Sequence, residues 1–481
     1  MSNKQKNKSV SIIFLMIMQA ALDFLNIGAF LPLFGLLAKP DFISSLVWLP
    51  FDLANRPPQQ LAVIFSAGII FFTVIKTVIV WFITQTKARF AYQIAHDISL
   101  RILNEGLSMD YQTLTSTDYS AEMDRIANKP LAFANNIVIG LTSLIAEGLI
   151  GLLILVALTI FNFRLLISLL LVVTPVALIY FLNRNRIKVI SNTIKIKYPQ
   201  TLKYALQAME GWMEVKTYQK ENYFSAHFKT TSRDLANAFA EDHVVQVFTS
   251  RISELFASLI ICVIVFWTVF TNNVYEETMI ILAVYVGASF RLLPSVNRIL
   301  NAIIQIKSHE YLIDELASRN PANNFGKRAE ALSFVKDISL ASVSFSYPDR
   351  PSLFEGVNFR INKGEKVALV GKSGGGKTSM LLLLLGIVKP TKGTIWLDDK
   401  QIQQLGTGYQ SLFSHVSQSP YVLDGSLKEN VAFGIEPKDI DQKKVMECLR
   451  EVNLSSFTEQ LPLGLETQIG ERGIMLSGGQ R

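Results

Sequence analysis

Long apolar runs fill the first 305 residues of the chain, and only short ones follow residue 331. A helix needs about 20 mostly apolar residues to cross a bilayer, and six of the runs reach or approach that length. The pattern predicts an all-α transmembrane domain at 1–318, a linker at 319–331 and a soluble domain at 332–481. The predicted spans are Val10–Ala38, Leu61–Thr84, Ile137–Ile160, Leu165–Leu182, Leu255–Phe270 and Met279–Ile304.

Lysine and arginine residues are distributed unevenly between the predicted spans. They precede the first span, and they gather between spans two and three and between spans four and five, whereas the alternate loops hold few. Because positive loops stay on the cytoplasmic side, both termini and the soluble domain are expected in the cytoplasm. We expect the first run to be a span and not a cleavable signal peptide, because it is long and carries Asp23.

The two loops on the cytoplasmic side are long and have apolar residues at helical spacing. This favours membrane helices that continue into the cytoplasm and bring short turns near Gln112–Ala121 and Gly211–Tyr218 to the soluble domain. The alternative is a pair of solvated helical hairpins that contact nothing else.

Five ionisable residues lie within or at the edge of the spans. They are Asp23, Lys76, Glu147, Glu254 and Arg291. A charge in hydrocarbon is costly unless it faces protein or water. These residues therefore line a polar cavity, pair with one another, or reach the interface from a helix end.

After the polar linker, which Pro321 and Gly326 interrupt, the pattern changes to short β-like runs separated by turn residues. The expected strands are Ile338–Phe345, Val357–Ile361, Val367–Val370 and Thr394–Leu397. Strands mixed with helical stretches indicate an α/β domain.

Within this domain, Gly371–Thr378 reads GKSGGGKT and lies between the run Val367–Val370 and the apolar stretch Met380–Leu385. Strand, glycine loop and helix, in that order, form a P-loop. The glycines let backbone N–H groups surround phosphate oxygens, and the helix N-terminus adds its dipole. Lys377 is expected to bind the β- and γ-phosphates, and Thr378 to offer its hydroxyl to Mg²⁺. The candidate loop residues are Gly371, Lys372, Ser373, Gly374, Gly375, Gly376, Lys377, Thr378 and Ser379.

Composition agrees with a membrane protein, since half of the residues are hydrophobic and 18% are charged. The net charge of +7 allows a nucleic-acid partner, but the placement of the cations favours loops that face the anionic inner leaflet. We therefore expect the lipid bilayer as partner and no nucleic acid. The two cysteines, Cys262 and Cys448, have no metal-ligand or disulfide spacing.

Three further motifs stand in register with the P-loop. Tyr347 ends the run VSFSYP, Gln418 lies in HVSQSP, and the sequence LSGGQ spans 476–480. This series resembles the nucleotide-binding domain of an ABC transporter, and LSGGQ is that family's signature. With six preceding spans and long inner loops, nearly the whole chain resembles an exporter-type ABC half-transporter.

The resemblance implies roles for single residues. Tyr347 would stack on adenine, and Gln418 would meet Mg²⁺ and the attacking water, so that Lys377 and Gln418 become the catalytic candidates and Thr378 and Gln418 the metal ligands. Ser477, Gly478, Gly479 and Gln480 would close over ATP that is held by a second subunit. Glu471 resembles the exporter loop that touches the cytoplasmic helix extensions.

The sequence departs from the family pattern after the signature. The family continues with an apolar strand ending in Asp-Glu, a D-loop and a switch histidine, and residues 1–481 contain none of these. Asp398-Asp399 comes before Gln418 and reads as a turn after a strand. Because phosphoryl transfer needs a carboxylate for Mg²⁺, we expect the 481 residues alone to bind ATP but to hydrolyse it poorly. This also suggests a fragment of a longer chain, with an exposed sheet edge where the missing strand would pair.

Taken together, the sequence predicts ATP-driven export or flipping of an amphipathic substrate by two half-transporters, with ATP and Mg²⁺ as cofactors. The expected location is a bacterial inner membrane. Lipid-linked oligosaccharides are suggested by resemblance, and peptides, lipids and drugs remain open. The alternative is a non-hydrolysing ATP-binding subunit of a heterodimeric transporter.

Overall fold

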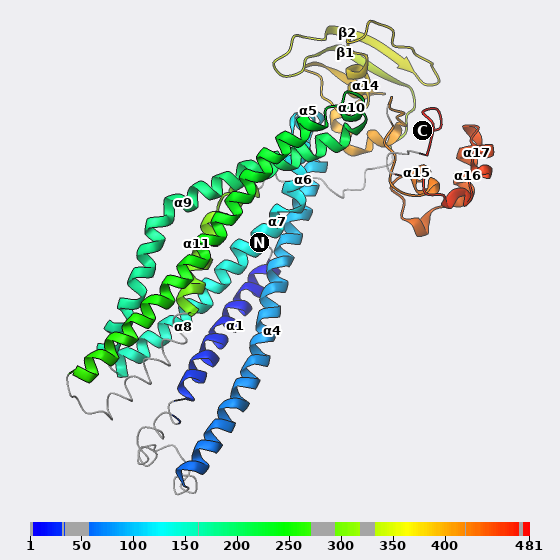
Figure 1. Cartoon of the computed structure of the whole chain (residues 1–481). Helices are drawn as coiled ribbons and strands as arrows, with labels where there is room; N and C mark the ends of the chain where they lie inside the picture. The colour runs from blue at the N-terminus through cyan, green and yellow to red at the C-terminus, as the bar shows by residue number, and fades with distance from the viewer. Residues whose placement is uncertain are drawn as a thin grey trace. The chain divides into compact units, whose positions relative to one another are not determined.

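The computed structural model describes residues 3–30, 33, 57–161, 163–270, 294–317, 332–418, 420–470 and 475–481. The chain divides into two compact units, Met1–Gly326 and Lys327–Arg481 (Figure 1). Several sequence predictions lie outside the described residues. They concern nearly all of 31–38 in the first span, residues 279–293 of the sixth with Arg291, the linker 319–331, and Glu471.

The first unit consists of helices, as predicted. They are α1 (Asn3–Gly28), α4 (Pro58–Leu107), α5 (Tyr111–Ser116), α6 (Tyr119–Ala127), α7 (Lys129–Phe133), the π-helix η2 (Ala134–Val138), α8 (Ile139–Phe161), α9 (Phe163–Glu210), α10 (Trp212–Thr217), α11 (Glu221–Phe270) and α13 (Tyr311–Glu315). Residues 294–308 are also helical.

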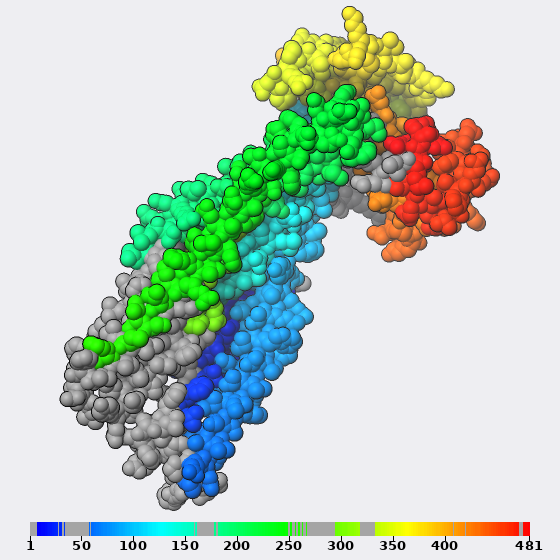
Figure 2. Space-filling model, viewed as in Figure 1, coloured from blue at the N-terminus to red at the C-terminus, as the bar shows by residue number. Residues whose placement is uncertain are grey.

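The helices α4, α9 and α11 contain 50, 48 and 50 residues. At 1.5 Å per residue each is about 75 Å long, more than twice the ~30 Å of a bilayer's hydrocarbon core. The long helices run roughly together in Figure 1, and Figure 2 shows α11 along one face of this unit. The predicted continuation of membrane helices beyond the bilayer agrees with these lengths.

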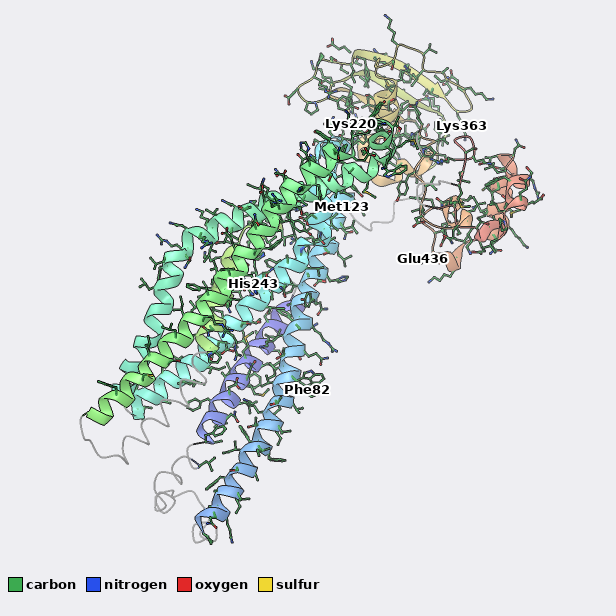
Figure 3. The ribbon with its side chains drawn as sticks, in the orientation of Figure 1. Phe82, Met123, Lys220, His243, Lys363 and Glu436 are labelled. Atoms are coloured by element: carbon green, nitrogen blue, oxygen red, sulfur yellow. The ribbon has the colours of Figure 1, made fainter. Side chains whose placement is uncertain are left out.

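Three described segments are long and apolar enough to cross a membrane: Asn7–Asn26, Gln59–Leu107 and Lys129–Ala157. They correspond to the first three predicted spans, while the fourth and fifth lie inside α9 and α11. Large apolar side chains are exposed along the membrane part of α4, and Figure 3 shows Phe82 on its outer side. Such a continuous exposed apolar surface is expected to face lipid.

Short helices separate the long ones at the two predicted turn regions. Figure 1 shows α5 and α10 at the same end of the first unit. Asp118 caps α6 by accepting the N–H of Ser120 at 3.0 Å, and its other carboxylate oxygen accepts from Lys203 Nζ of α9 at 2.9 Å. This contact ties the two helix extensions together near their ends.

Three of the five ionisable residues of the predicted spans are paired, whereas the Glu254 side chain and Arg291 lie outside what the structure describes. Lys76 of α4 lies 3.1 Å from the Asp23 carboxylate of α1. Glu147 accepts from Ser295 at 2.7 Å and from Arg298 at 2.6 Å. Pairing is one of the three arrangements that the sequence left open, and it offsets the cost of placing charge among apolar helices.

A cluster of buried charge surrounds Arg125 of α6, which is only 2% exposed. Its guanidinium donates to Glu122 at 3.0 Å and lies 3.5 Å from Glu105 of α4. It also donates to the carbonyl oxygens of Glu315 at 2.9 Å and Ala317 at 3.3 Å. Arginine suits this position because its planar fork carries five N–H donors. One side chain thus holds α4 and α6 to the C-terminal end of α13.

Replacing Arg125 should therefore destabilise the first unit strongly. Arg125→Met removes the buried cation beside Glu105 and Glu122, although Arg101 remains 3.6 Å from Glu105, and we expect the free energy of unfolding to fall by about 3–5 kcal/mol. Denaturant or thermal unfolding of the detergent-solubilised chain measures this loss.

The matched control is Arg186→Met. Arg186 pairs with Glu241 at 3.3 Å, but both side chains are about half exposed. Such a pair contributes less than about 1 kcal/mol. Equal effects of the two substitutions would contradict a structural role for the buried cluster.

The second unit contains a four-stranded antiparallel sheet in the order β2-β1-β3-β4. Its strands are β1 (Asp337–Phe345), β2 (Phe354–Asn362), β3 (Lys392–Leu397) and β4 (Lys400–Gln401). Asp398 and Asp399 form the turn between β3 and β4, as predicted. Gly393 has φ +82, and a Cβ there would lie 2.3 Å from the Ser342 carbonyl oxygen of β1. Only glycine permits this close approach of the two strands.

The predicted strand Val367–Val370 is wrong for this structure. Among residues 332–418 and 420–470, no strand pairs with these residues, and Val370 is 93% exposed. An extended segment becomes a strand only when a neighbour satisfies its backbone groups. Val416 is likewise 91% exposed.

Helices complete the second unit. They are α14 (Lys377–Leu384), η3 (Ile402–Gln404), η4 (Gly406–Gly408), η5 (Gln410–Leu412), α15 (Leu427–Val431), η6 (Pro437–Asp439), α16 (Gln442–Glu451), α17 (Ser455–Gln460) and η7 (Gly464–Glu466). Figure 1 shows α14 beside the sheet and α15–α17 as a separate group. Leu427, Val445, Leu449 and Ile469 are buried in the core of that group.

Candidate nucleotide-binding site

The glycine loop leads directly into α14, which begins at Lys377. Gly374 and Gly376 have φ of +77 and +84, a backbone region that other L-residues rarely adopt. A Cβ on Gly376 would also lie 3.2 Å from the Phe354 ring of β2. The positive φ favours glycine at position 376, and a Cβ there would also crowd the Phe354 ring. Sequence reasoning found the loop, but it gave no indication that Phe354 packs against it.

The Lys377 side chain folds back across the loop. Its Nζ donates to the carbonyl oxygens of Gly371 and Lys372, both at 2.8 Å. Gly375 closes the turn with an N–H bond of 3.1 Å to the same Lys372 carbonyl. The Lys377 ammonium group is thus held inside a small backbone loop that directly precedes the N-terminus of α14. A cation next to a helix N-terminus is an arrangement that can bind an anion.

The glycine loop is open on one side. A Cβ built at Gly371 or Gly374 would meet nothing within 4 Å, so the loop is open on that side. Ser373 and Thr378 are exposed, whereas Ser379 is buried. The exposed Thr378 hydroxyl could reach a metal ion on the phosphates, as the sequence suggested.

Tyr347 lies next to the first turn of α14, although it is 32 residues earlier than Ser379 in the chain. The two hydroxyl groups are 3.1 Å apart and share a hydrogen bond. The Tyr347 ring meets Phe345 edge-on, with centroids 5.0 Å apart and an interplanar angle of 78°. These contacts hold a half-buried aromatic ring beside the loop, two residues beyond the end of β1.

Gln418 is exposed in the segment 413–418, which has no regular secondary structure. Among the described residues of the second unit, no hydrogen bond joins Gln418 to the glycine loop. The structure therefore brings Tyr347 to the loop but does not bring Gln418 into direct contact with it.

The signature turn closes on itself. Ser477 N–H donates to the Gln480 side-chain oxygen at 2.8 Å, and Gln480 N–H lies 3.3 Å from Ser477 Oγ. This reciprocal pattern is a capping box, the arrangement that starts a helix. Leu476 is buried in the core of the α15–α17 group, while Ser477, Gly478 and Gly479 are exposed. The turn is thus anchored on one side through Leu476, and its serine and glycines are exposed on the other.

The part of the chain that the structure describes contains no group of three or more His, Cys, Asp or Glu side chains that could hold a metal ion. Asp398 has another role, because its carboxylate accepts the backbone N–H groups of Lys336 at 2.7 Å and Asp337 at 3.0 Å. Both predicted Mg²⁺ ligands, Thr378 and Gln418, are exposed.

Comparison with known proteins agrees with these features. Residues 354–481 match the family model described as ABC transporter. ABC transporter B family member 1 of Dictyostelium discoideum is 26% identical over 466 residues, which is 92% of this chain and 49% of the relative. ATP-dependent permease MDL1 of Candida albicans is 38% identical over 173 residues, 35% of this chain and 25% of the relative. The chain thus spans about half the length of the first of these relatives.

The fold was also compared with solved structures. The structure of a bacterial Atm1-family ABC exporter with ATP bound superposes with a TM-score of 0.77 at 18% identity. The match covers 99% of this chain and 82% of the exporter chain. In fold and in its matched domain, the chain therefore resembles an exporter-type ABC half-transporter.

Proposed function

We propose that the chain binds Mg-ATP at Gly371–Thr378 and uses its hydrolysis to export or flip an amphipathic substrate across a membrane. The observation that carries this proposal is the Lys377 ammonium group held inside the glycine loop by two carbonyl oxygens at 2.8 Å. A triphosphate can replace those carbonyls as the partner of the cation, with the helix N-terminus behind it. The name of the Candida relative, an ATP-dependent permease, supports the same activity.

A second copy or a related half-transporter completes the proposed site. The exposed Ser477, Gly478 and Gly479 of one subunit, with the half-buried Gln480, close over the ATP held by the other. Tyr347 stacks on adenine, and Gln418 meets Mg²⁺ and the attacking water once the nucleotide is bound. Two ATP molecules then hold two soluble domains together. Because ATP binds the closed pair better than the open pair, it biases the equilibrium between them.

The membrane part completes the cycle. Closure moves the α5 and α10 ends of the long helices, and the exposed Lys203–Asp118 pair is one contact between α9 and the start of α6 near those ends. The distribution of positive residues supports cytoplasmic termini and a cytoplasmic ATP domain. We place the protein in a bacterial inner membrane. Lipid-linked oligosaccharides are the proposed substrate class, on the resemblance of the first and sixth spans.

Residues 1–481 by themselves are proposed to bind ATP better than they hydrolyse it. The carboxylate of Asp398 is engaged with the backbone at 335–337 and does not serve Mg²⁺. Phosphoryl transfer needs a group that orients the attacking water as well as a metal. The alternative is a subunit of a heterodimeric transporter that binds ATP but does not hydrolyse it, even as the whole gene product.

ATPase assays of the purified chain in lipid nanodiscs test the proposal. We expect turnover by the full gene product that lipid-linked oligosaccharides stimulate, and little turnover by residues 1–481 above a Lys377→Ala background. Strong Lys377-dependent turnover by residues 1–481 would contradict the proposed deficiency. Stimulation by peptides alone would contradict the substrate class, and an inactive full product would favour the non-hydrolysing subunit.

Nucleotide affinity should depend on the Lys377 cation. Lys377→Ala removes the charge from the centre of the loop, and we expect ATP to bind about 10- to 100-fold more weakly. The matched control is Lys363→Ala, another lysine of the second unit, which Figure 3 labels between β2 and the loop. Titration with a fluorescent ATP analogue measures both variants. If the two variants bind equally well, the cation has no special role.

Two substitutions of Tyr347 separate its ring from its hydroxyl. Tyr347→Phe loses the hydrogen bond to Ser379 but keeps the ring, so ATP affinity should change by less than about threefold. Tyr347→Ala loses base stacking, which is worth ~1–3 kcal/mol, and affinity should fall about tenfold or more. The same titration applies. An equal loss in both variants would show that the Ser379 contact, and not stacking, is what matters.

A further inference from the structure

Two arginines hold the C-terminal end of α13. Arg101 of α4 donates to the carbonyl oxygen of Leu316 at 2.6 Å. Arg125 of α6 donates to the carbonyl oxygens of Glu315 at 2.9 Å and Ala317 at 3.3 Å. The last carbonyls of a helix have no N–H partner within it, and cations near them are favourable. We call these contacts, made by Arg101 and Arg125 to the carbonyls of 315–317, the α13 clamp.

Side chains of α13 strengthen the clamp. Leu312 and Leu316 are 0% and 4% exposed and belong to the same core cluster as Ile102 of α4. The Glu315 carboxylate lies 2.6 Å from Lys129 Nζ of α7. A helix of only five residues has little stability by itself. The position of α13 is therefore set by the helices that surround it, and a displacement of α13 acts on them.

The clamp lies where the chain leaves the first unit, because it is the last part described before the second unit begins. The first residues described in the second unit are also fixed within that unit. The Asp398 carboxylate accepts the backbone N–H groups of residues 335–337 at 2.7–3.1 Å. Only residues 318–334 separate the two fixed points in the chain. A movement of the second unit that draws this connection taut would therefore act on the clamp.

The helix α4 connects the clamp to the membrane part. Arg101 and Lys76 belong to this one uninterrupted helix, and about 37 Å of helix separates them. Lys76 pairs with Asp23 of α1 at 3.1 Å inside the predicted second span. Since a continuous helix is stiff along its axis, a shift at Arg101 is passed to this pair.

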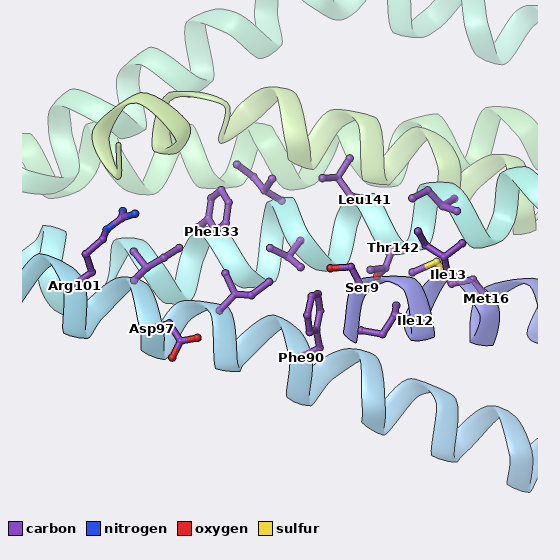
Figure 4. Close-up of a pocket in the computed structure, with 15 residues that line it drawn as sticks. Ser9, Ile12, Ile13, Met16, Phe90, Asp97, Arg101, Phe133, Leu141 and Thr142 are labelled. Atoms are coloured by element: carbon purple, nitrogen blue, oxygen red, sulfur yellow. The ribbon is translucent and has the colours of Figure 1, made fainter. Parts of the chain in front are cut away.

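A pocket beside the clamp leaves α4 room to shift. Figure 4 shows Arg101 at one end of this pocket, which has a volume of about 640 Å³ and lies between α1, α4 and the segment that leads from α7 into α8. Phe90 of α4 and Phe133 of α7 line it. A close-packed interior resists displacement, whereas side chains that line a void have fewer contacts to lose. A shift of α4 against the α7–α8 segment therefore breaks few contacts here.

We propose that the α13 clamp couples the two units, and that Arg101 is the positioning residue through which ATP-driven movement of the second unit reaches α4. This inference rests on the proposed ATP-dependent closure. It adds a route through the chain connection to the route through the α5 and α10 ends. Arg101 is suited to a test because its side chain is 46% exposed, whereas Arg125 is buried and its loss would destabilise the fold.

Pulsed electron paramagnetic resonance of the full gene product in lipid nanodiscs tests the proposal. One spin label per copy is attached at Phe82→Cys, an exposed position on the membrane part of α4, with the native cysteines replaced by serine. The probe is a non-hydrolysable ATP analogue with Mg²⁺. We expect the analogue to shift the populations of the label–label distances between two copies. Arg101→Gln should weaken that shift in the equilibrium constant about 2- to 10-fold.

The matched control is Arg186→Gln. Arg186 is 54% exposed and pairs with Glu241 of α11 at 3.3 Å, so it resembles Arg101 in exposure and charge but does not hold α13. Both variants should bind the analogue with unchanged affinity and unfold at the same temperature as the unaltered chain. Arg101→Lys keeps a donor for the Leu316 carbonyl and should retain most of the shift.

The outcomes separate this inference from the proposed function. If the analogue does not bind the unaltered chain, the proposed function fails and the inference fails with it. If the analogue binds, a shift that Arg101→Gln leaves unchanged would overturn the coupling role alone. The same holds if the unaltered chain shows no shift, if Arg186→Gln weakens it equally, or if Arg101→Lys restores nothing.

Discussion

The chain depends on a backbone loop that only glycine can form. Gly374 and Gly376 adopt left-handed conformations, and a Cβ at 376 would lie 3.2 Å from the Phe354 ring. The loop places the Lys377 ammonium between two carbonyl oxygens at the start of α14. This concentrates positive potential from a cation and a helix N-terminus at one point. Every proposed step, from nucleotide binding to movement of the membrane helices, begins with an anion at this position.

The membrane part is subject to a different constraint, because charged side chains lie among its apolar helices and their burial is costly. The structure solves this by pairing, with Asp23 on Lys76 and Glu147 on Arg298. Further along the same unit, Arg125 gathers two carboxylates and two carbonyl oxygens. Breaking such a pair costs more than the pair itself contributes, because the remaining charge is left buried. These contacts therefore fix which helices move together in the proposed cycle.

Local patterns in the sequence predicted much of this fold, but they did not predict contacts between residues that are far apart in the chain. Hydrophobic periodicity located the helical unit and the short connections near Gln112–Ala121 and Gly211–Tyr218, because it depends on neighbours in the chain. The structure has the short helices α5 and α10 at these connections. The glycine motif gave the start of α14 at Lys377. The strand expected at Val367–Val370 failed because strand formation requires a partner, which the segment itself does not encode. The Tyr347–Ser379 contact and the carbonyl partners of Arg125 likewise depend on residues far apart in sequence.

The most direct measurement of the central claim compares the affinities of the purified chain for ATP, ADP and AMP by calorimetry in the presence of Mg²⁺. If the loop and Lys377 bind the phosphate chain, affinity should follow the number of phosphates, with AMP at least about 100-fold weaker than ATP. Equal affinities for the three nucleotides would place the binding energy on the base and sugar, and would contradict the account.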